Sequence, residues 1–298
     1  MSRMQLRNRV ADLCIGVRPS PPEQAGFSVP SHKRADDGAD ANARKLIRKR
    51  QSIERVIRVM AERIDDPLTN DAMAAVACFS PCHFNRLFRR MTGVPPLHFL
   101  YAMRLERAKR LLLTTEQSVT EICFEVGYNS LGTFVSRFSA LVGLSPSVYR
   151  RVSRNLNASG LDSFWKAVEN FSVPGAAGPA IRGRLVRPPG FGGSVLVGLF
   201  RRPIPEGAPA ACALVRDGDW YALPLPVDGK WFVMAIGVPW SANAMQLLTL
   251  DCLPRGCSGS MQVRAGRVTG STLVKLAPPS SLDPPVLACI PLLTTQQP

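Results

Sequence analysis

Apolar residues recur at helical spacing from Ile47 onward. Because these residues fall three and four positions apart, they form a single apolar stripe along a helix. The stripe consists of Ile53, Val56, Ile57, Met60 and Ile64. Asp65-Asp66-Pro67 is expected to end this helix, since a residue before proline is pushed out of the helical region. Residues 1–45 have no such periodicity and mix Arg, Pro, Ser, Gly and Asp, so we expect a disordered basic arm.

An internal repeat with an offset of 50 residues follows this helix. Each copy predicts a short helix, a turn, a serine N-cap and a second helix with two aromatic residues four positions apart. Serine suits the cap because its hydroxyl accepts an unpaired backbone N–H, and Pro81 occupies the first helical position in the first copy. The matched pairs are Val76 and Val126, Ser80 and Ser130, Phe84 and Phe134, Phe88 and Phe138, Gly93 and Gly143, and Pro96 and Pro146.

The segment Leu97–Leu113 joins the two copies and contains neither Gly nor Pro. Its apolar and basic residues follow helical spacing, and Glu106 with Arg110 forms an i,i+4 pair of opposite charge. A helix of this length spans about 25 Å at ~1.5 Å per residue. We therefore expect a strut that holds the two copies apart, followed by a capping box from Ser118 to Glu121 that opens the next helix.

The pattern changes after Arg154, where Ser163–Phe171 predicts a short amphipathic helix and Val173–Ala180 a Gly/Pro/Ala linker. Beyond residue 181, short apolar runs alternate with Pro and Gly, which is typical of an antiparallel β-sandwich. The predicted strands are Ser194–Phe200, Ala210–Val215, Trp220–Leu225, Trp231–Val238, Gln246–Asp251, Met261–Val268, Thr272–Leu276 and Val286–Leu293.

The fold class expected from these patterns is a multidomain α plus all-β chain. An all-α double helix-turn-helix domain with a linker helix is followed by an antiparallel β-sandwich. The expected boundaries are 1–45 for the arm, 46–153 for the double helix-turn-helix domain, 154–180 for a linker, and 181–298 for a sandwich of unknown role.

Charge adds a functional class to this architecture. The 298 residues carry a formal net charge of +15, spread along the chain. An excess of this size favours a polyanionic partner such as nucleic acid, although many solvated surfaces are basic without one. There is no apolar run of 18 residues and no secretory h-region, so we expect a cytoplasmic protein with no membrane partner.

The eight cysteines indicate neither a metal site nor a disulfide framework. They form no C-x-x-C pair and have no histidine at zinc spacing, so we expect no metal and no cofactor. Cys78, Cys82 and Cys123 lie in helical patterns, where a reduced cysteine behaves as a small apolar residue. A redox switch at Cys252 and Cys257 is the alternative.

The helix that begins after Ser80 carries the main candidate chemistry. Its apolar stripe leaves an outward side with an amide, a histidine and several arginines. Arg can donate two bonds to guanine and Asn can pair with adenine in both directions, and the major groove admits a helix. A solvated basic face on an ordinary bundle is the alternative. The candidate DNA-binding residues here are Cys82, His83, Asn85, Arg86, Arg89 and Arg90.

The second copy presents fewer long donors. Its outward side suits methyl groups and DNA shape, with hydroxyls that bond phosphates or bases. We therefore expect weaker specificity here than in the first copy. The candidate residues are Leu131, Gly132, Thr133, Val135, Ser136 and Arg137.

At this point the residues resemble a known family. Ser80–Gly93 is similar to the first recognition helix of AraC-type (arabinose-regulator) transcription factors, and Arg104–Leu112 to their linker helix. Ser118–Tyr128, Phe134–Phe138 and Gly143–Pro146 resemble the second unit. The resemblance covers 47–151, about a third of the chain.

The resemblance implies a sequence-specific transcription regulator that inserts two helix-turn-helix units into adjacent major-groove faces of double-stranded DNA, with RNA polymerase as a further partner. Two departures concern single positions. Cys78 stands where the family usually has the turn glycine, and Ser136 stands where an arginine is common. The family's contact positions carry over to Cys82, Asn85 and Arg86, and to Leu131, Gly132, Thr133, Val135 and Ser136.

The C-terminal part faintly resembles transthyretin-like or carboxypeptidase-regulatory β-sandwiches through residues 198–200, 211–213 and 227–231. Such a domain suits a small-molecule effector, a protein partner or dimerisation, and a passive appendage is the alternative. In the family, the DNA-binding unit normally ends the chain, whereas here about 140 residues follow it.

Two rival classes have less support. For an enzyme, the C-terminal half contains no histidine, and Ser163-Phe164-Trp165-Lys166 and Gly190-Phe191-Gly192-Gly193 lack partner motifs. We therefore expect no catalytic residues and no enzymatic activity. A non-specific architectural DNA protein would share the basic charge but would not require two capped recognition helices.

Overall fold

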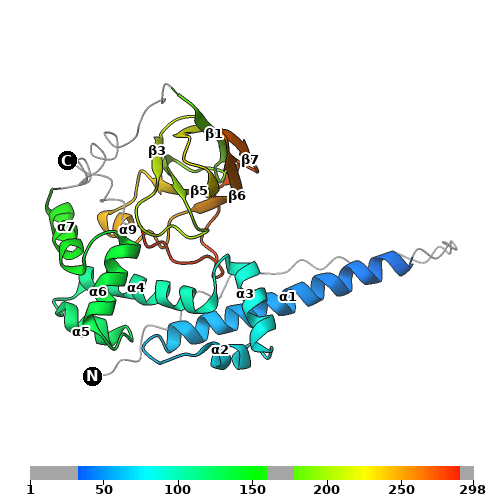
Figure 1. The fold of residues 1–298 in the computed structure, drawn as a ribbon, viewed down its shortest axis with the longest axis horizontal. Helices are drawn as coiled ribbons and strands as arrows, with labels where there is room; N and C mark the ends of the chain where they lie inside the picture. Colours follow the sequence, from blue (N-terminus) through cyan, green and yellow to red (C-terminus); the bar gives the residue numbers. More distant parts are fainter. Residues whose placement is uncertain (1–32, 160–177, 289–298) are drawn as a thin grey trace, which may run out of the picture. The chain divides into compact units, whose positions relative to one another are not determined.

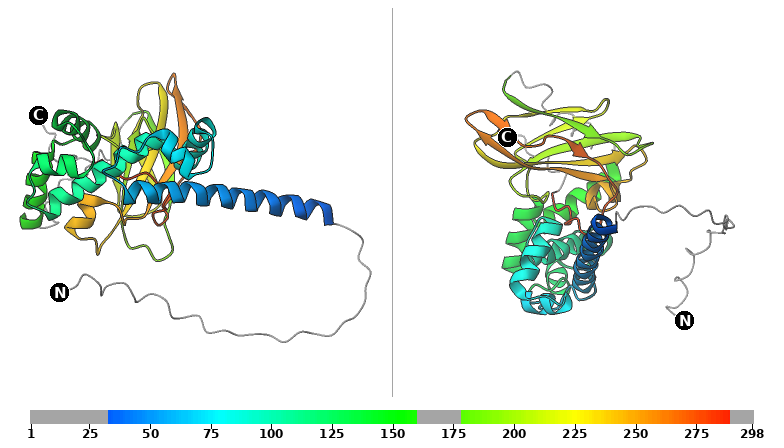
Figure 2. Two further views of the ribbon diagram at one scale, coloured as in Figure 1. Left: turned by 90° about the horizontal axis from the view of Figure 1, so that it is seen from below. Right: turned by 90° about the vertical axis from the view of Figure 1, so that its right-hand side faces the viewer.

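The computed structural model describes residues 33–159 and 178–288. The chain forms two compact units, residues 1–45 and 46–298, and each is described by itself. Figure 1 labels the helices and strands, and Figure 2 gives two further views. The predicted helix at 163–171, and the whole of the predicted arm before Lys33, lie outside the described residues.

Helix α1 (Lys33–Glu62) begins earlier than expected. Residues 33–45 are helical, where the sequence predicted the end of an irregular arm. Alanines such as Ala41 and Ala43 have the highest helix propensity, and Arg44 pairs with Asp40 one turn away at 2.6 Å. These local preferences favour a helix without any apolar stripe, which explains why periodicity alone missed it.

Six further helices complete the predicted helical region. Their apolar faces share one core, in which aromatic rings meet edge to face. Ring centroids lie 5.5 Å apart between Phe88 and Phe99, and 5.8 Å apart between Phe138 and Tyr149. The helices are α2 (Asn70–Val76), α3 (Pro81–Thr92), α4 (Pro96–Thr114), α5 (Val119–Glu125), α6 (Leu131–Val142) and α7 (Pro146–Ser159).

The structure corrects the register of the repeat. The second helices of the two copies, α3 and α6, are offset by 50 residues, but α2 and α5 are offset by 49. Buried Ala77, not the partly exposed Val76, therefore occupies the place of buried Val126. The second turn is longer by one residue. In both turns one residue takes a left-handed conformation, Cys78 with φ 58° and Gly127 with φ 82°.

The helix caps follow the predictions in part. Ser118 and Glu121 form the predicted capping box, and Ser130 accepts a bond from the backbone N–H of Thr133 at 3.4 Å. Ser80 makes no such side-chain bond, which corrects the predicted cap of α3. Pro81 at the first helical position removes one of the amide donors that a cap would otherwise serve.

A separate sheet region follows the helices. One sheet is antiparallel throughout, with the order β3-β2-β5-β6-β7, and the other has the order β4-β1-β8. The β1–β8 pair is parallel, which departs from the purely antiparallel arrangement predicted. The elements are β1 (Ala180–Val186), β2 (Gly193–Phe200), β3 (Ala211–Val215), β4 (Trp220–Pro224), β5 (Gly229–Pro239), α9 (Ala244–Thr249), β6 (Arg255–Arg264), β7 (Arg267–Thr269) and β8 (Val274–Lys275).

Several strand predictions were wrong in detail. Strand β1 was missed because arginines occupy its outward positions and a glycine stands between the buried Ile181 and Leu185 on its inward side. The strand predicted at 246–251 is largely helix α9, which Asn243 opens with a capping box. The strand predicted at 261–268 contains the Ala265-Gly266 turn between β6 and β7, where both residues have positive φ. Residues 286–288 of the last predicted strand are irregular, and the rest lies outside the described residues.

The five-stranded sheet is covered on both faces. One face shares an apolar core with the three-stranded sheet, including Val197, Val233 and Leu223. The other face packs against α9 and the segment around Val286, through residues such as Leu196. This accounts for the complete burial of β2. Among the described helices, none combines the length and the apolar character that a membrane span needs.

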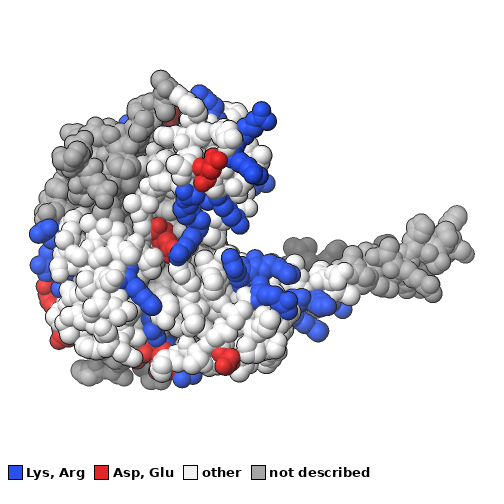
Figure 3. Space-filling model, viewed as in Figure 1, with Lys and Arg blue, Asp and Glu red and all other residues white. Residues whose placement is uncertain are grey.

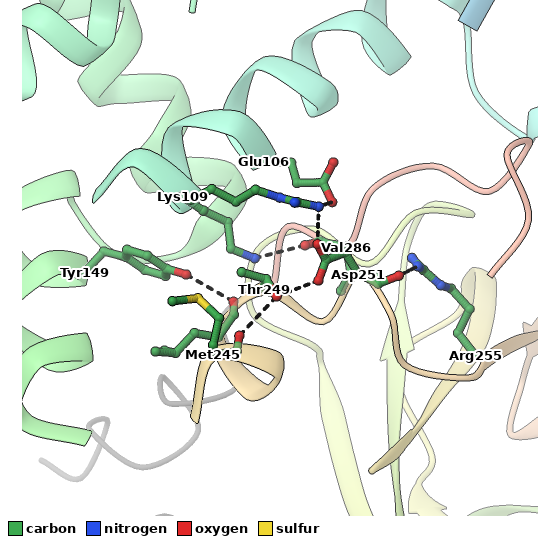
Figure 4. Close-up of polar contacts among 10 residues, drawn as sticks. Glu106, Lys109, Tyr149, Met245, Thr249, Asp251, Arg255 and Val286 are labelled. Carbon is green, nitrogen blue, oxygen red and sulfur yellow. Dashed lines mark hydrogen bonds and ion pairs between the residues drawn. The ribbon is translucent and has the colours of Figure 1, made fainter. Parts of the chain in front are cut away.

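The sheet region is joined to the helices by buried contacts. Ile204 and Leu287, both from the sheet region, belong to the core of the helical region. Lys109 of α4 is fully buried, and its Nζ donates to the backbone oxygen of Val286 at 3.0 Å (Figure 4). Tyr149 of α7 donates to the oxygen of Leu248 at 3.0 Å. Helix α4 is therefore packed on both sides, which a simple strut between two units would not require.

Candidate nucleic-acid interface

Helix α3 places its predicted residues on the outside. Phe84, Leu87 and Phe88 are buried in the core, as the apolar stripe predicts. Each of the six candidate residues is exposed or half-buried, so the helix presents a continuous polar side. These residues are Cys82, His83, Asn85, Arg86, Arg89 and Arg90.

Asn85 is held close to its own helix in this state. Its side-chain Nδ2 donates to the backbone oxygen of Pro81 at 3.0 Å. The bond links exposed groups in the first turn, so water can replace it at little cost. The amide must leave Pro81 before it can donate to a base.

A basic hollow of about 250 Å³ lies beside the outward side of α3. It is lined by His83, Arg86 and Arg90 of α3 and by Lys49 of α1. Figure 3 shows the basic side chains gathered over α3 and the adjoining part of α1. Such a concentration of positive charge suits the phosphate groups of a nucleic acid.

Sequence reasoning missed Lys49 because it treated α1 only as a packing helix. A signal was present, since the segment 44–50 contains five basic residues. The half-buried Lys49 follows the exposed Arg48 in this run. The fold brings Lys49 next to α3, although the two are more than 30 residues apart in sequence.

Helix α6 also exposes its predicted residues, with one exception in orientation. Leu131, Gly132, Thr133 and Ser136 are exposed, and Val135 is half-buried. The guanidinium of Arg137 lies over the ring of Tyr101 in α4, 4.3 Å from the ring centroid. Contact with the Tyr101 hydroxyl raises the pKa of Arg137 above its ordinary value. This arginine is thereby held against α4 by a cation–π contact.

Arg104 fixes the second turn to the end of α1. It is only 6% exposed, and its guanidinium donates to three backbone oxygens. The distances are 2.8 Å to Ile64, 2.7 Å to Asp66 and 2.9 Å to Gly127. Burial lowers the pKa of Arg104, but three charge-assisted bonds compensate the buried charge. The sequence placed Arg104 on a helix without indicating these partners.

The expectation that the cysteines in helical patterns behave as small apolar residues holds for buried Cys123 and not for Cys78 or Cys82. Cys78 and Cys82 are exposed, because Cys78 lies in the turn and Cys82 on the outward side of α3. Cys123 and Cys212 are buried, and burial raises the pKa of both thiols, that of Cys212 to about 12. Both cysteines of the alternative redox pair, Cys252 and Cys257, are free thiols.

The motifs that an enzyme would need gain no support from their surroundings. Residues 163–166 lie outside the described part of the chain. Gly190–Gly193 runs from a turn into β2 and opens no helix, so it lacks the backbone amides of a phosphate-binding helix end. Within residues 33–159 and 178–288, no group of His, Cys, Asp or Glu side chains is arranged to hold a metal ion.

Two pairs of short helices, each with an exposed second helix on an aromatic core, define a helix-turn-helix protein. A family model described as "Helix-turn-helix domain" matches residues 73–152. The Transposon Tn10 TetD protein of Escherichia coli is 31% identical over 99 residues, which cover 33% of this chain and 72% of that protein. The chain belongs to the AraC family of helix-turn-helix transcription regulators.

Other relatives match a share of the chain of similar size. The HTH-type transcriptional regulator GlxA of Rhizobium meliloti is 37% identical over 98 residues, 33% of this chain. The HTH-type transcriptional activator AarP of Providencia stuartii is 33% identical over 91 residues, 29% of this chain and 67% of AarP. The chain spans about a third of the length of several curated relatives that it matches, 30% in the case of GlxA.

Solved structures also match about a third of the chain. The DNA-binding domain of AdpA in complex with a target DNA is 31% identical, with a TM-score of 0.35, and the match covers 36% of this chain and 97% of that one. An AraC-type regulator from Chromobacterium violaceum is 26% identical, with a TM-score of 0.33, over 34% of this chain and 91% of that one.

Proposed function

We propose that the protein is a sequence-specific DNA-binding transcription regulator with its DNA-binding domain at 46–153. The units α2–α3 and α5–α6 form a double helix-turn-helix that enters adjacent major-groove faces of one duplex. One observation carries this proposal. Both second helices bury their aromatic residues and expose their opposite sides, while α4 and the three bonds of Arg104 hold the two units in a fixed relation.

Helix α3 supplies most of the base discrimination in this proposal. The exposed guanidinium of Arg86 can donate two bonds to a guanine. Asn85 turns from Pro81 to pair with an adenine. Lys49, His83 and Arg90 line the basic hollow beside Arg86, and they fix the register by contacting phosphates.

Helix α6 supplies weaker discrimination. Thr133 and Ser136 offer only short hydroxyls, and Leu131 and Val135 offer methyl contacts to thymine. Arg137 lies over Tyr101, so a base contact from it would require the cation–π contact to break. The second unit is therefore proposed to read shape and methyl groups, and Arg137 to hold α6 against α4.

The proposal is tested by selecting binding sites from a random duplex library with the full chain. Fluorescence anisotropy then measures affinity for the selected site. Arg86→Ala is expected to cost about 1–3 kcal/mol and to relax preference at one position. Arg264→Ala removes an exposed arginine of β6 and serves as the charge-matched control. Equal affinity for all duplexes would instead favour a non-specific architectural protein.

Salt provides an independent check of the phosphate contacts. If about 6–10 phosphates are neutralised, affinity falls by roughly 10³–10⁵ between about 50 and 200 mM salt. Lys49→Ala is expected to lower the slope by about one without changing the preferred sequence. An affinity that does not depend on salt would contradict the proposed interface.

We also propose two further partners, RNA polymerase and a partner of the sheet region. Promoter-bound regulators contact RNA polymerase, and an exposed side of the helical region would serve this purpose. The sheet region at 181–298 is proposed to accept a small-molecule or protein partner, because its buried contacts with α4 and α7 give any such partner a route to the DNA-binding helices. No catalytic role is proposed for it.

A further inference from the structure

A cavity lies where the sheet region meets the C-terminal end of α3. It has a volume of about 240 Å³, and Thr92 and Gly93 of α3 form part of its wall. Met234 and Ile236 of β5 line the side that belongs to the sheet, together with Val286. Sites for drug-sized ligands commonly measure roughly 300–1,000 Å³, so this cavity suits a small metabolite.

An apolar pocket lies next to this cavity. It has a volume of about 50 Å³ and shares Met234, Ile236 and Val286 with the larger cavity. Its other walls include Leu196 and Leu250. A ligand in the larger cavity can therefore place a short apolar group in the pocket, where burial of apolar surface contributes about 25 cal/mol per Å².

Two charged side chains of opposite sign line the larger cavity. Arg255 donates through Nη2 to the backbone oxygen of Asp251 at 2.6 Å, and its buried Nε has no hydrogen-bond partner among the described residues (Figure 4). The carboxylate of Asp251 is bound instead by Arg110 and Thr249. Nη1 of Arg255 makes no hydrogen bond within the described residues, so this nitrogen keeps donor capacity for an anionic group in the cavity.

Asp283 supplies the opposite charge. Its Oδ2 accepts from the backbone N–H of Ser280 at 2.8 Å, which fixes the carboxylate in a turn. Within the described parts of the chain, no ion pair at 4.0 Å or less joins Asp283 to Arg255, although both line the same cavity. The charge of Asp283 still acts on Arg255 and opposes the lowering of the Arg255 pKa by burial. A half-buried cation and a half-buried anion that line one cavity without direct contact suit a ligand that carries both charges.

We propose that this cavity binds a small zwitterion with an apolar side chain, namely an apolar α-amino acid. The carboxylate binds Arg255, the ammonium binds Asp283, and the side chain enters the apolar pocket. A carboxylate on a guanidinium and an ammonium on a carboxylate are both charge-assisted hydrogen bonds, which are about twice as strong as neutral ones.

The position of the cavity couples the ligand to the recognition helix, a step that rests on the proposed function. Thr92 closes the last turn of α3 by donating to Phe88, 2.9 Å away. A methyl group at Gly93 would lie 3.4 Å from Cβ of Pro203, so the loop after β2 packs directly against this helix end. A ligand between Thr92 and β5 changes the position of α3, and thereby the affinity for DNA.

Isothermal titration calorimetry of the full chain tests the site without DNA. The probes are L-leucine, L-methionine and L-phenylalanine. Two analogues of leucine each lack one charge: α-ketoisocaproate has no ammonium and isoamylamine has no carboxylate. We expect at least one amino acid to bind, and both analogues to bind at least about tenfold more weakly, as the loss of a charge-assisted bond predicts.

Substitutions of the two charged residues test which one binds each charge of the amino acid. Arg255→Met and the isosteric Asp283→Asn are each expected to weaken amino-acid binding at least about tenfold. Arg264→Met on the same strand and Asp217→Asn on the surface are the matched controls, and they should bind as the parent does. No heat with any of the three amino acids, or equal binding of an analogue that lacks one charge, would overturn the site.

Anisotropy with the selected DNA site then tests the coupling. Saturating amino acid is expected to shift the affinity of the parent for DNA at least about fivefold, within the usual range of allosteric coupling. It should have no effect on Asp283→Asn. Unchanged affinity of the parent would overturn the coupling. A chain that binds an amino acid but no DNA sequence would support the site and contradict the proposed function, so the two failures are distinguishable.

Discussion

Replacement of Arg104 by leucine should destabilise the helical region strongly. Arg104 is 6% exposed and donates to the backbone oxygens of Ile64, Asp66 and Gly127. Leucine fills a similar volume but leaves three buried acceptors without their donor. Each lost partner costs roughly 1–3 kcal/mol, and removal of the buried charge offsets part of this. We expect a loss of about 3–5 kcal/mol in the free energy of unfolding.

The assay is thermal unfolding followed by circular dichroism and calorimetry. For a unit of this size, 1 kcal/mol corresponds to about 2–4 °C in Tm, so the midpoint should fall by about 10 °C. Arg107→Leu is the matched control, because Arg107 lies on the same helix, is exposed, and pairs with Glu125 at 3.4 Å. An exposed pair contributes about 0–1 kcal/mol.

A small effect of Arg104→Leu would contradict the role of these bonds. If Arg104→Leu lowers the free energy of unfolding by less than about 1 kcal/mol, or no more than Arg107→Leu does, the three backbone contacts do not hold the second turn. Arg104→Lys gives an intermediate test. A lysine keeps the charge but lacks the planar fork, so it cannot reach three separate oxygens at once.

Four further substitutions test the two turns and the dependence of stability on pH. Gly127→Ala should lower the free energy of unfolding by more than about 2 kcal/mol in denaturant titration, because φ is 82° and a Cβ would lie 2.8 Å from the Asp65 backbone. Cys78→Gly, at the equivalent turn with φ 58°, should instead raise it by up to about 1 kcal/mol. A loss of stability in Cys78→Gly would contradict backbone strain at that turn. Burial raises the pKa of Glu106, so the folded state holds its proton longer, and Glu106→Gln should gain stability over the parent as pH rises from 4.5 through the folded pKa. Burial acts to raise the pKa of Asp251, but the hydrogen bond from Thr249 and the charge of Arg110 lower it on balance. Asp251→Asn should therefore be less stable than the parent above pH 3.8. This deficit should vanish as the pH falls through the pKa of Asp251 in the folded state. Equal pH dependence of unfolding in both variants would contradict these opposite signs.

Local patterns in the sequence predicted α2 to α6 well, because apolar spacing and boundary signals coincide there, whereas α7 and the first part of α1 were not predicted. Ser118 with Glu121 opens α5, and Gly93 ends α3 in a left-handed conformation. The offset of the repeat was misjudged in its first half, since one added residue in a turn changes no apolar spacing within a helix.

The sheet region was harder to predict because its elements are short and their burial depends on distant partners. Strand β1 has arginines on its outer side, and α9 has an apolar run that fits either a strand or a helix. The candidate site shows the same division. The outward residues of α3 followed from periodicity, whereas Lys49 joined them only through tertiary packing. Likewise, nothing in the sequence indicated that Arg137 would lie over Tyr101.

The buried lysine of α4 has a consequence for the order of synthesis. Lys109 donates to the oxygen of Val286, and the neighbouring Leu287 lies in the core of the helical region. During translation the helices leave the ribosome long before these two residues exist. At about 5–20 residues per second, the delay over some 180 residues is roughly 10–40 s. Throughout that interval the nascent helices lack Leu287, which is part of their apolar core. Ribosome-bound chains arrested before residue 286 should therefore be more sensitive to protease than released chains.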